Sequence, residues 1–382
     1  MGCRLRRAIS GRIFMKKKPF DFILFMTVLI LLSLGLIMVF SASAPMAEKE
    51  SGNIYYYINR QLVFAAIGTV SMILAANYDY HKFGRKTVWA LFLVSVVLLI
   101  LVLIPGIGSE ANDSRRWVVI AGFRFQPSEL AKLSLILFFS FNLSRRKKPL
   151  NSFFGDLMPY LFALGIICVL LLLETHLSAT IIMIAISMII LFVAGAKIRH
   201  FAILIVPVVV TIIAVISFTD YMTPRINSWL DPWSDPRGSG YQTIQSLYAI
   251  ASGGLFGRGL GQSMQKFLYV PEPHNDYIFP ILAEELGFIG AIAVILLFLI
   301  FIWRGIKIAV HAPDVYGCLI ASGITALIAV QSLFNIAVVT NSVPPTGVSL
   351  PFFSAGGTAL ILFMTEAGIL LNISRYSTYD RI

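Results

Sequence analysis

The sequence predicts an all-α polytopic membrane protein with ten transmembrane helices and a large extracytoplasmic loop between the seventh and the eighth helix. Of the 382 residues, 58% are hydrophobic and only 13% are charged, and the mean hydropathy is +0.83. This composition is typical of a chain that lies mostly in lipid. A spanning helix needs about 20 mostly apolar residues, because its backbone polar groups must be satisfied within the helix in hydrocarbon.

Ten apolar segments meet this requirement. In chain order they are residues 21–42, 58–77, 87–104, 127–143, 159–173, 177–194, 200–218, 276–303, 315–339 and 356–373. Pro127 suits the first turn of the fourth helix, where the missing N–H costs nothing. Only Glu174 to Ser178 separates the fifth segment from the sixth. This pair therefore forms either a tight hairpin or a helix that is broken at membrane depth.

The distribution of Lys and Arg orients the chain. The net charge of +11 lies mainly in alternate loops, as expected when basic residues prefer the cytoplasmic side. With the N-terminus inside, that side holds residues 4–18, Lys82, Arg85, Lys86, residues 145–148, Lys197, Arg199, Arg304, Lys307, Arg375 and Arg381. Both termini are then cytoplasmic. Nucleic acid is not an expected partner, since these charges are scattered over short loops without interleaved aromatic residues.

The predicted organisation is one transmembrane domain over residues 21–374, between a basic cytoplasmic N-terminus at 1–20 and a cytoplasmic tail at 375–382. Met15 and the three lysines after it form a more natural start, so residues 1–14 are expected to be an annotation artefact. The first apolar run is about twice as long as a signal-peptide core, which argues against cleavage.

Two long loops, residues 105–126 and 219–275, fall on the extracytoplasmic side, and long loops in compact proteins commonly carry function. In the larger loop, the apolar spacing of residues 240–250 predicts a short amphipathic helix at the membrane interface. The glycines of residues 253–261 do not predict a nucleotide site, because no strand precedes them and they face away from the nucleotide pools.

The most informative stretch runs from Tyr269 to Gly287, where a charged, proline-rich cluster meets the eighth apolar segment. A carboxylate such as Asp276 at the start of a membrane helix is costly in hydrocarbon, so it is expected to face a cavity. Burial would raise its pKa, and the helix dipole would oppose that rise. Asp276 could instead hold a divalent cation, Mg²⁺ or Mn²⁺, or simply cap the helix.

Other polar groups are expected around the same site. Glu129 and Lys132 share one helix face and form either part of a substrate site or a structural ion pair. Arg116 beside Trp117 suits a diphosphate, and equally a lipid headgroup. Residues 344–358, rich in Pro and Gly, predict a re-entrant loop in the wall of the cavity. His176 is expected to be an ordinary interfacial histidine.

Several motifs then occur together in a fixed order. They are Arg116-Trp117, the segment 126–132 (QPSELAK), Gly240-Tyr-Gln with Gln245-Ser246, the glycines 257, 259 and 261, Pro271-Glu with His274 and Asp276, the segment 283–287 (AEELG), and Leu350-Pro-Phe with Ser354 and Gly356-Gly357. From about Asp21 to Ser374 the chain resembles the SEDS family of bacterial cell-wall proteins, which includes FtsW, RodA and SpoVE. The FtsW/SpoVE branch fits better than RodA.

The resemblance implies a peptidoglycan glycosyltransferase that polymerises lipid II at the outer face of the bacterial cytoplasmic membrane, for division, sporulation or elongation. It implies a class B penicillin-binding protein and other divisome or elongasome membrane proteins as partners. In the implied inverting reaction, undecaprenyl pyrophosphate leaves and Asp276, which matches the essential aspartate of the family, is the general base. The expected substrate contacts are Arg116, Trp117, Glu129, Lys132, Gln242, Gln245, Glu272, His274, Ser354, Gly356 and Gly357.

The sequence departs from the family pattern at Asn275, Tyr277 and Ala355, and in the segment 174–180, which lacks a common aspartate that Glu174 could replace only in part. A lipid II flippase and a noncatalytic scaffold for the penicillin-binding protein are the alternative functions. A flippase needs polar residues along a path to the cytoplasmic side. The notable charges crowd near the outer surface instead, which favours the enzyme.

Overall fold

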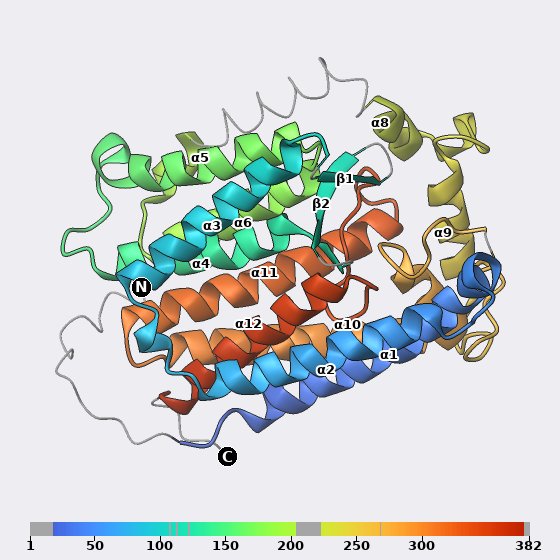
Figure 1. Ribbon diagram of the computed structural model, residues 1–382, viewed down its shortest axis with the longest axis horizontal. Coiled ribbons are helices and arrows are strands. Elements are labelled where there is room, and N and C mark those ends of the chain that lie inside the picture. Colours follow the sequence, from blue (N-terminus) through green and yellow to red (C-terminus); the bar gives the residue numbers. More distant parts are fainter. Residues whose placement is uncertain are drawn as a thin grey trace.

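The computed structural model describes residues 18–106, 108–111, 114–120, 123–203, 223–267 and 269–377. Long helices lie side by side along the longest axis of the molecule, and the sheet, α8 and α9 gather at one end (Figure 1). The long helices are α1 (Phe22–Ser51), α2 (Tyr56–Asn77), α3 (Arg85–Leu103), α4 (Pro127–Ser144), α5 (Met158–Leu173), α6 (Leu177–Val193), α10 (Ile278–Val310), α11 (Val315–Val339) and α12 (Gly357–Arg375). The short helical elements are η2 (Tyr80–Lys82), η3 (Phe153–Leu157), α8 (Thr223–Leu230), η4 (Pro232–Ser234) and α9 (Tyr241–Ser252).

Seven of the described helical segments are long and apolar enough to cross a membrane: α1, α2, α3, the run Phe153–Leu173 that contains α5, α10, α11 and α12. The sixth predicted span corresponds to the shorter apolar helix α6, and the fourth to α4. The seventh, at 200–218, lies mostly outside the described residues, so the predicted count of ten is not tested. The fifth and sixth segments form the tight hairpin, since α5 and α6 are separated by three residues.

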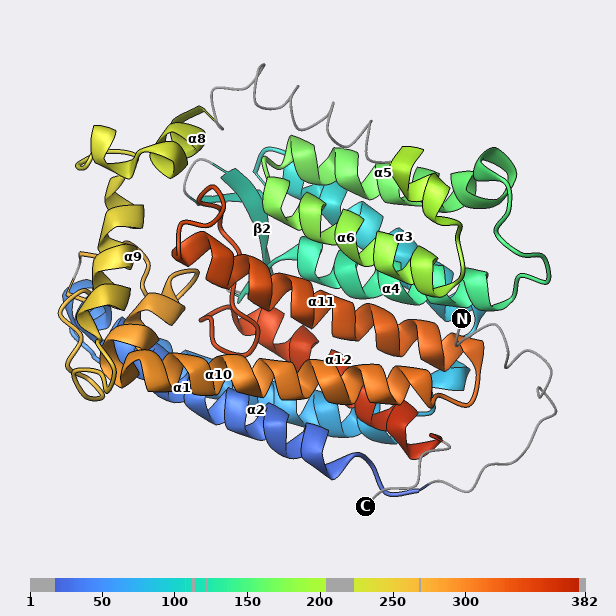
Figure 2. The ribbon, with the colours of Figure 1, turned by 180° about the vertical axis from the view of Figure 1, so that it is seen from behind.

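The centre of the bundle explains why α4 is less apolar than its neighbours. Almost every side chain of α4 is buried, because the helix packs against α3, α6 and α11. In the view from behind, α10 and α11 lie in front of α12, which packs closely on α2 (Figure 2). Interior helices of this kind can carry polar groups, since their side chains meet protein and not lipid.

Polar contacts close the end of the bundle opposite α8 and α9. The N–H of Lys18 donates to the carbonyl of Arg375 at 3.0 Å, so the two ends of the described chain meet there. Arg304 of α10 forms a buried ion pair with Asp21, which also caps α1. The hydroxyl of Tyr80 donates to Asp314 at 2.6 Å, between the α2–α3 and α10–α11 connections. The α2–α3 and α4–α5 connections, which carry predicted basic residues, lie at this same end (Figure 1).

Helix α10 is broken at Gly287, whose φ of 70° and ψ of −170° are not helical. A break in a membrane helix requires other partners for the freed backbone groups. The connecting loop supplies them: the N–H groups of Arg258 and Gly259 donate to the carbonyls of Glu284 and Glu285, and those of Phe288 and Ile289 donate to the carbonyls of Gly254 and Leu255. The first part of α10, which follows Asp276, is thereby fixed to the glycine-rich loop of residues 253–261.

The two predicted extracytoplasmic loops contain more regular structure than their composition indicates. Residues 105–126 include an antiparallel sheet of β1 (Gly108–Ala111), β2 (Ser114–Ile120) and β3 (Phe123–Phe125), in the order β1-β2-β3. The predicted amphipathic helix in the larger loop is confirmed as α9. Between α11 and α12 the chain is not helical and folds back into the bundle, as predicted for residues 344–358.

Candidate functional site

A cavity of about 1030 Å³ opens at the end of the bundle that carries α8, α9 and the sheet. Segments far apart in the sequence build its wall. Of the predicted site residues, the structure brings these to the cavity: Arg116, Trp117, Glu129, Lys132, Gln242, Glu272, His274, Asp276, Ser354, Gly356 and Gly357. Gln245, one turn beyond Gln242 on α9, does not line it.

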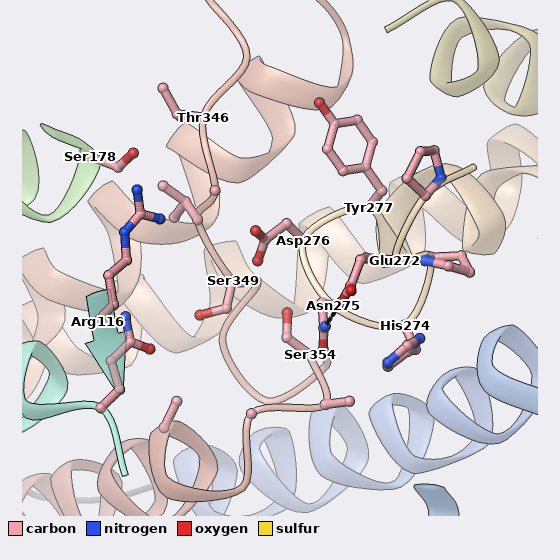
Figure 3. A pocket seen from close by; sticks show the side chains of 18 of the residues that line it. Arg116, Ser178, Glu272, His274, Asn275, Asp276, Tyr277, Thr346, Ser349 and Ser354 are labelled. Carbon is pink, nitrogen blue, oxygen red and sulfur yellow. Dashed lines mark hydrogen bonds between the residues drawn. The ribbon is translucent and has the colours of Figure 1, made fainter. Parts of the chain in front are cut away.

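Asp276 lies two residues before α10 and projects into the cavity (Figure 3). Asn335 of α11 fixes its backbone, because the Nδ2 group donates to the Asp276 carbonyl at 2.8 Å and to the Val348 carbonyl at 2.6 Å. Among the described residues, none donates a hydrogen bond to the Asp276 carboxylate. Tyr277 occupies the cap position of α10 without a side-chain cap, so the alternative role of Asp276 as a helix cap is not observed.

The surroundings of Asp276 make it a stronger base than an ordinary aspartate. Burial raises its pKa to about 6, and the charges of Glu272 and Glu129 add to the rise. The guanidinium groups of Arg116 and Arg225 oppose it. A carboxylate with this pKa is still ionised at neutral pH and accepts a proton more readily than one near pKa 4.

Gly347 separates Asp276 from Arg116. A Cβ atom at this glycine would lie 2.8 Å from Oδ2 of Asp276 and 3.7 Å from Nη1 of Arg116. Arg116 comes from β2, and its Nη2 donates to the carbonyl of Thr175 at 2.7 Å. Because residue 347 has no side chain, the Asp276 carboxylate and the Arg116 guanidinium face the same small volume.

Glu129 and Lys132 form the predicted ion pair, and a chain of hydrogen bonds continues from Lys132 to neighbouring segments of the bundle. Lys132 Nζ donates to Glu129 Oε1 and to Gln331 Oε1, each at 2.7 Å, and the Gln331 amide donates to the carbonyl of Ser349 at 3.1 Å. Both charged side chains are buried. The pair therefore links α4 to α11 and to the re-entrant loop, and it also forms part of the cavity wall.

The re-entrant loop is held by side chains on both sides. Ser354 Oγ accepts from the N–H of Leu350 at 2.8 Å, and the Ser354 carbonyl accepts from Gln61 of α2 at 3.2 Å. A Cβ atom at Gly357 would lie 2.2 Å from the ring of Phe64. Ser354 and Gly357 thus have evident structural roles in shaping the cavity.

On the side of the cavity opposite Arg116, the segment from Glu272 to Asn275 forms a tight turn (Figure 3). Asn275 Nδ2 donates to Glu272 Oε2, and the N–H of Ala355 donates to the carbonyl of His274 at 2.9 Å. His274 is buried against the ring of Tyr57, and burial lowers the pKa of its imidazole, while Glu272 and Glu50 oppose that shift.

The structure corrects the expectation for His176 and adds residues that the sequence analysis missed. His176 is 5% exposed and lines the cavity, whereas Glu174, the expected substitute for the common aspartate, does not. Further lining residues are Glu50, Tyr57, Arg60, Gln61, Arg225 and Gln331. Arg60 and Gln61 carried a usable signal, because polar residues within a predicted membrane span usually face a cavity.

Comparisons with known proteins agree with this architecture. A family model described as "Cell cycle protein", for FtsW, RodA and SpoVE, matches residues 22–379. The chain is 45% identical to "Stage V sporulation protein E" of Bacillus subtilis (strain 168), over 95% of this chain and 99% of that one. It is 39% identical to "Probable peptidoglycan glycosyltransferase FtsW" of Geobacter sp. (strain M18), over 93% and 96% of the two chains.

Two solved structures share the fold. One is described as "Structural coordination of polymerization and crosslinking by a peptidoglycan synthase complex", with a TM-score of 0.77, 27% identity, and coverage of 94% of this chain and 99% of that chain. The other is the rod shape determining protein RodA of Thermus thermophilus, with a TM-score of 0.68, 25% identity, and coverage of 94% and 98%.

Proposed function

Because the chain belongs to the FtsW, RodA and SpoVE family of cell cycle proteins, we propose that it is a peptidoglycan glycosyltransferase. It is a multi-pass membrane protein. Its relatives include SpoVE and FtsW proteins, the branch of the family that the sequence motifs favour over RodA. The observation that carries the chemistry is the Asp276 carboxylate, which faces the large cavity, accepts no hydrogen bond from the described residues and has a raised pKa beside Arg116.

The proposed substrate is lipid II. The 4-hydroxyl of the GlcNAc of one lipid II attacks the anomeric carbon of the MurNAc of the growing chain, and its proton passes to Asp276. The new glycosidic C–O bond forms as the bond from that carbon to the diphosphate oxygen breaks, with inversion, and undecaprenyl diphosphate takes the electron pair. A base near pKa 6 suits this role, because it is free of its proton at neutral pH.

The leaving diphosphate carries negative charge into the cavity, and cationic side chains are available there. Arg116 and Arg225 both lie close enough to Asp276 to affect its pKa. Arg is suited to this function, since its planar group donates two parallel hydrogen bonds to phosphate oxygens. Lys132 contributes charge from deeper in the wall, where Glu129 and Gln331 orient it.

A divalent cation, Mg²⁺ or Mn²⁺, remains part of the proposal. The described residues contain no group of three or more His, Cys, Asp or Glu side chains with metal-binding geometry. In this alternative to its role as base, Asp276 would hold such an ion with Glu272 and oxygens of the substrate's diphosphate, a common arrangement for Mg²⁺. The ion would supply further charge against the leaving diphosphate.

We place the cavity at the outer face of the bacterial cytoplasmic membrane, with both termini in the cytoplasm. The contact between Lys18 and Arg375 supports termini on one side, and the basic loops lie at that end. The partner is a class B penicillin-binding protein that crosslinks the glycan strands. The likeness to a complex that couples polymerization and crosslinking supports this partner.

The test of this function is glycan-chain formation from labelled lipid II by the purified full-length protein in complex with its cognate transpeptidase. Polymer that forms with an inactivated transpeptidase site supports the glycosyltransferase. Transbilayer movement of lipid II in vesicles without polymer would instead indicate a flippase. Absence of both activities, with the complex intact, would indicate a scaffold.

A further inference from the structure

We propose that the first turn of α6, together with His176 and Arg116, binds the diphosphate of the lipid carrier that leaves in the reaction. This subsite deepens the proposed function and rests on it. Apart from Arg116, it lies in the segment 174–180, where the sequence departs from the family pattern, so the carried-over roles do not include His176 or the start of α6.

His176 is a buried polar side chain whose ring is available to hydrogen-bond a ligand in the cavity. It is 5% exposed and lines the same cavity as Asp276. Within the described part of the chain its imidazole has no hydrogen-bond partner, and Nδ1 is fully buried. Burial, followed by the charges of Arg116 and Lys132, lowers the pKa of His176 well below its ordinary value. A neutral imidazole still donates one N–H, which a phosphate oxygen can accept.

The start of α6 is a second donor group. The helix has 17 residues, begins at Leu177 and carries no side-chain cap. The first N–H groups of a helix have no partner within it, and the helix dipole places partial positive charge there. Ser178, Ala179 and Ile182 all line the cavity, so this end of the helix faces the site. A phosphate group is a favourable ligand for such a helix end.

The backbone just before α6 is strained, and this strained conformation helps to hold Arg116 beside the start of the helix. Thr175 has a φ of 54°, a conformation that a β-branched residue rarely adopts. Its carbonyl accepts the hydrogen bond from Arg116, which fixes the guanidinium beside the helix end. Strain of this kind persists where the surrounding structure enforces it, commonly at ligand sites.

Glu174 does not oppose an anion at neutral pH. Its side chain is 1% exposed, and its carboxyl oxygens have no partner in the described structure. Burial raises the pKa of Glu174 to about 8, although Arg116 opposes the rise. The carboxyl group is therefore mostly protonated, and Arg116 is the charged side chain that acts on it.

The position relative to Asp276 indicates which lipid the subsite holds. Figure 3 shows Ser178 and Arg116 on one side of the pocket and Glu272 and His274 on the other, with Asp276 between them. In an inverting displacement, base and leaving group lie on opposite sides of the reacting carbon. The helix end lies beyond Arg116 as seen from Asp276, which suits the departing diphosphate.

The experiment compares binding of undecaprenyl diphosphate and undecaprenyl monophosphate to the purified complex with its transpeptidase. The native protein is expected to prefer the diphosphate. His176→Leu should reduce the ratio of the two affinities by about tenfold, the effect of one hydrogen bond to a charged group. His176→Gln, which restores an N–H donor, should recover most of the preference.

The matched control is His200→Leu, because His200 is also buried with an unpartnered Nδ1 but does not line the cavity. It should keep the native ratio. An unchanged ratio in both His176 variants would overturn the subsite. A ratio reduced equally by His200→Leu would also overturn it, since the effect would then be structural. The binding ratio does not depend on polymer formation, so failure of the proposed function is detected separately.

Discussion

Asp276 combines three properties of a general base within one residue. Its backbone is fixed by Asn335, its carboxylate faces the cavity, and burial raises its pKa to about 6. The same burial costs stability: the folded protein holds the proton more tightly than the unfolded chain, so the fold loses stability as the pH rises from about 4 to 6. Asp276 is thus better suited to chemistry than to holding the fold together.

The pH dependence of polymerisation follows from this pKa. The base acts without its proton, so kcat/KM is expected to rise through pH 6 and then level off, and at pH 5 to be about tenfold below the plateau. An aspartate with an ordinary pKa would keep nearly full activity at pH 5. Initial rates of glycan-chain formation between pH 5 and 8, after a check that the complex stays folded, measure the profile. A flat profile down to pH 5 would contradict the assigned role.

Gly347 offers a second test at the same scale. In Gly347→Ala the new methyl group would lie 2.8 Å from Asp276 Oδ2, so the carboxylate must move away. A displacement of about 1 Å at a reacting group can reduce the rate by about 100-fold, and we expect a loss of at least tenfold in kcat. Gly165→Ala in α5 is a control for folding, since nothing lies within 4 Å of a Cβ atom at Gly165 and its backbone is helical. Native kcat in Gly347→Ala, with thermal unfolding unchanged, would show that the contact is unimportant.

Among the elements, the long helices were predictable because apolar length alone determines a membrane span. The sheet at residues 108–125 was not, since its strands are short and lie among loop residues. The break at Gly287 was also hidden, because an isolated glycine is common in membrane helices. Tertiary packing, which no local pattern encodes, brings His176 of the α5–α6 turn to the same cavity as Asp276. Asp276, Arg116 and the Glu129–Lys132 pair were predicted from the placement of charge near membrane helices and from the family motifs.

The ion pair between α1 and α10 stabilises the end of the bundle remote from the cavity. Arg304 and Asp21 are both buried, and Arg304 Nε lies 3.1 Å from Asp21 Oδ2. Arg304→Ala leaves a buried carboxylate without its partner, which is expected to cost about 3 kcal/mol of unfolding free energy. Thermal unfolding of the detergent-solubilised protein measures the loss. The double variant Asp21→Asn/Arg304→Met should be more stable than Arg304→Ala, and the reverse order would contradict this account.

At the scale of the whole molecule, the two ends of the bundle differ in the groups that they carry. One end holds Lys18, Arg375 and the described basic loops, and the other contains the cavity, the sheet, α8 and α9. This polarity predicts a fixed orientation across the membrane.

Reporter fusions test that orientation. A reporter active only in the cytoplasm should work when fused after Ser377, and a reporter active only outside should work when inserted at Asp235, an exposed residue beside η4. The positive charge of the loops near Lys18 and Arg375 is the physical reason. Activity of the cytoplasmic reporter at Asp235 would reverse the proposed topology and place the cavity on the inner side.

The most direct test of the account is glycan-chain formation by Asp276→Asn, compared with the native protein in the same transpeptidase complex. Asparagine keeps the shape of the side chain but is not a base, and it removes the cost of burying a charge. The variant is expected to fold at least as stably at neutral pH, bind lipid II and form no polymer. Polymer at the native rate from Asp276→Asn would contradict general-base catalysis by this residue.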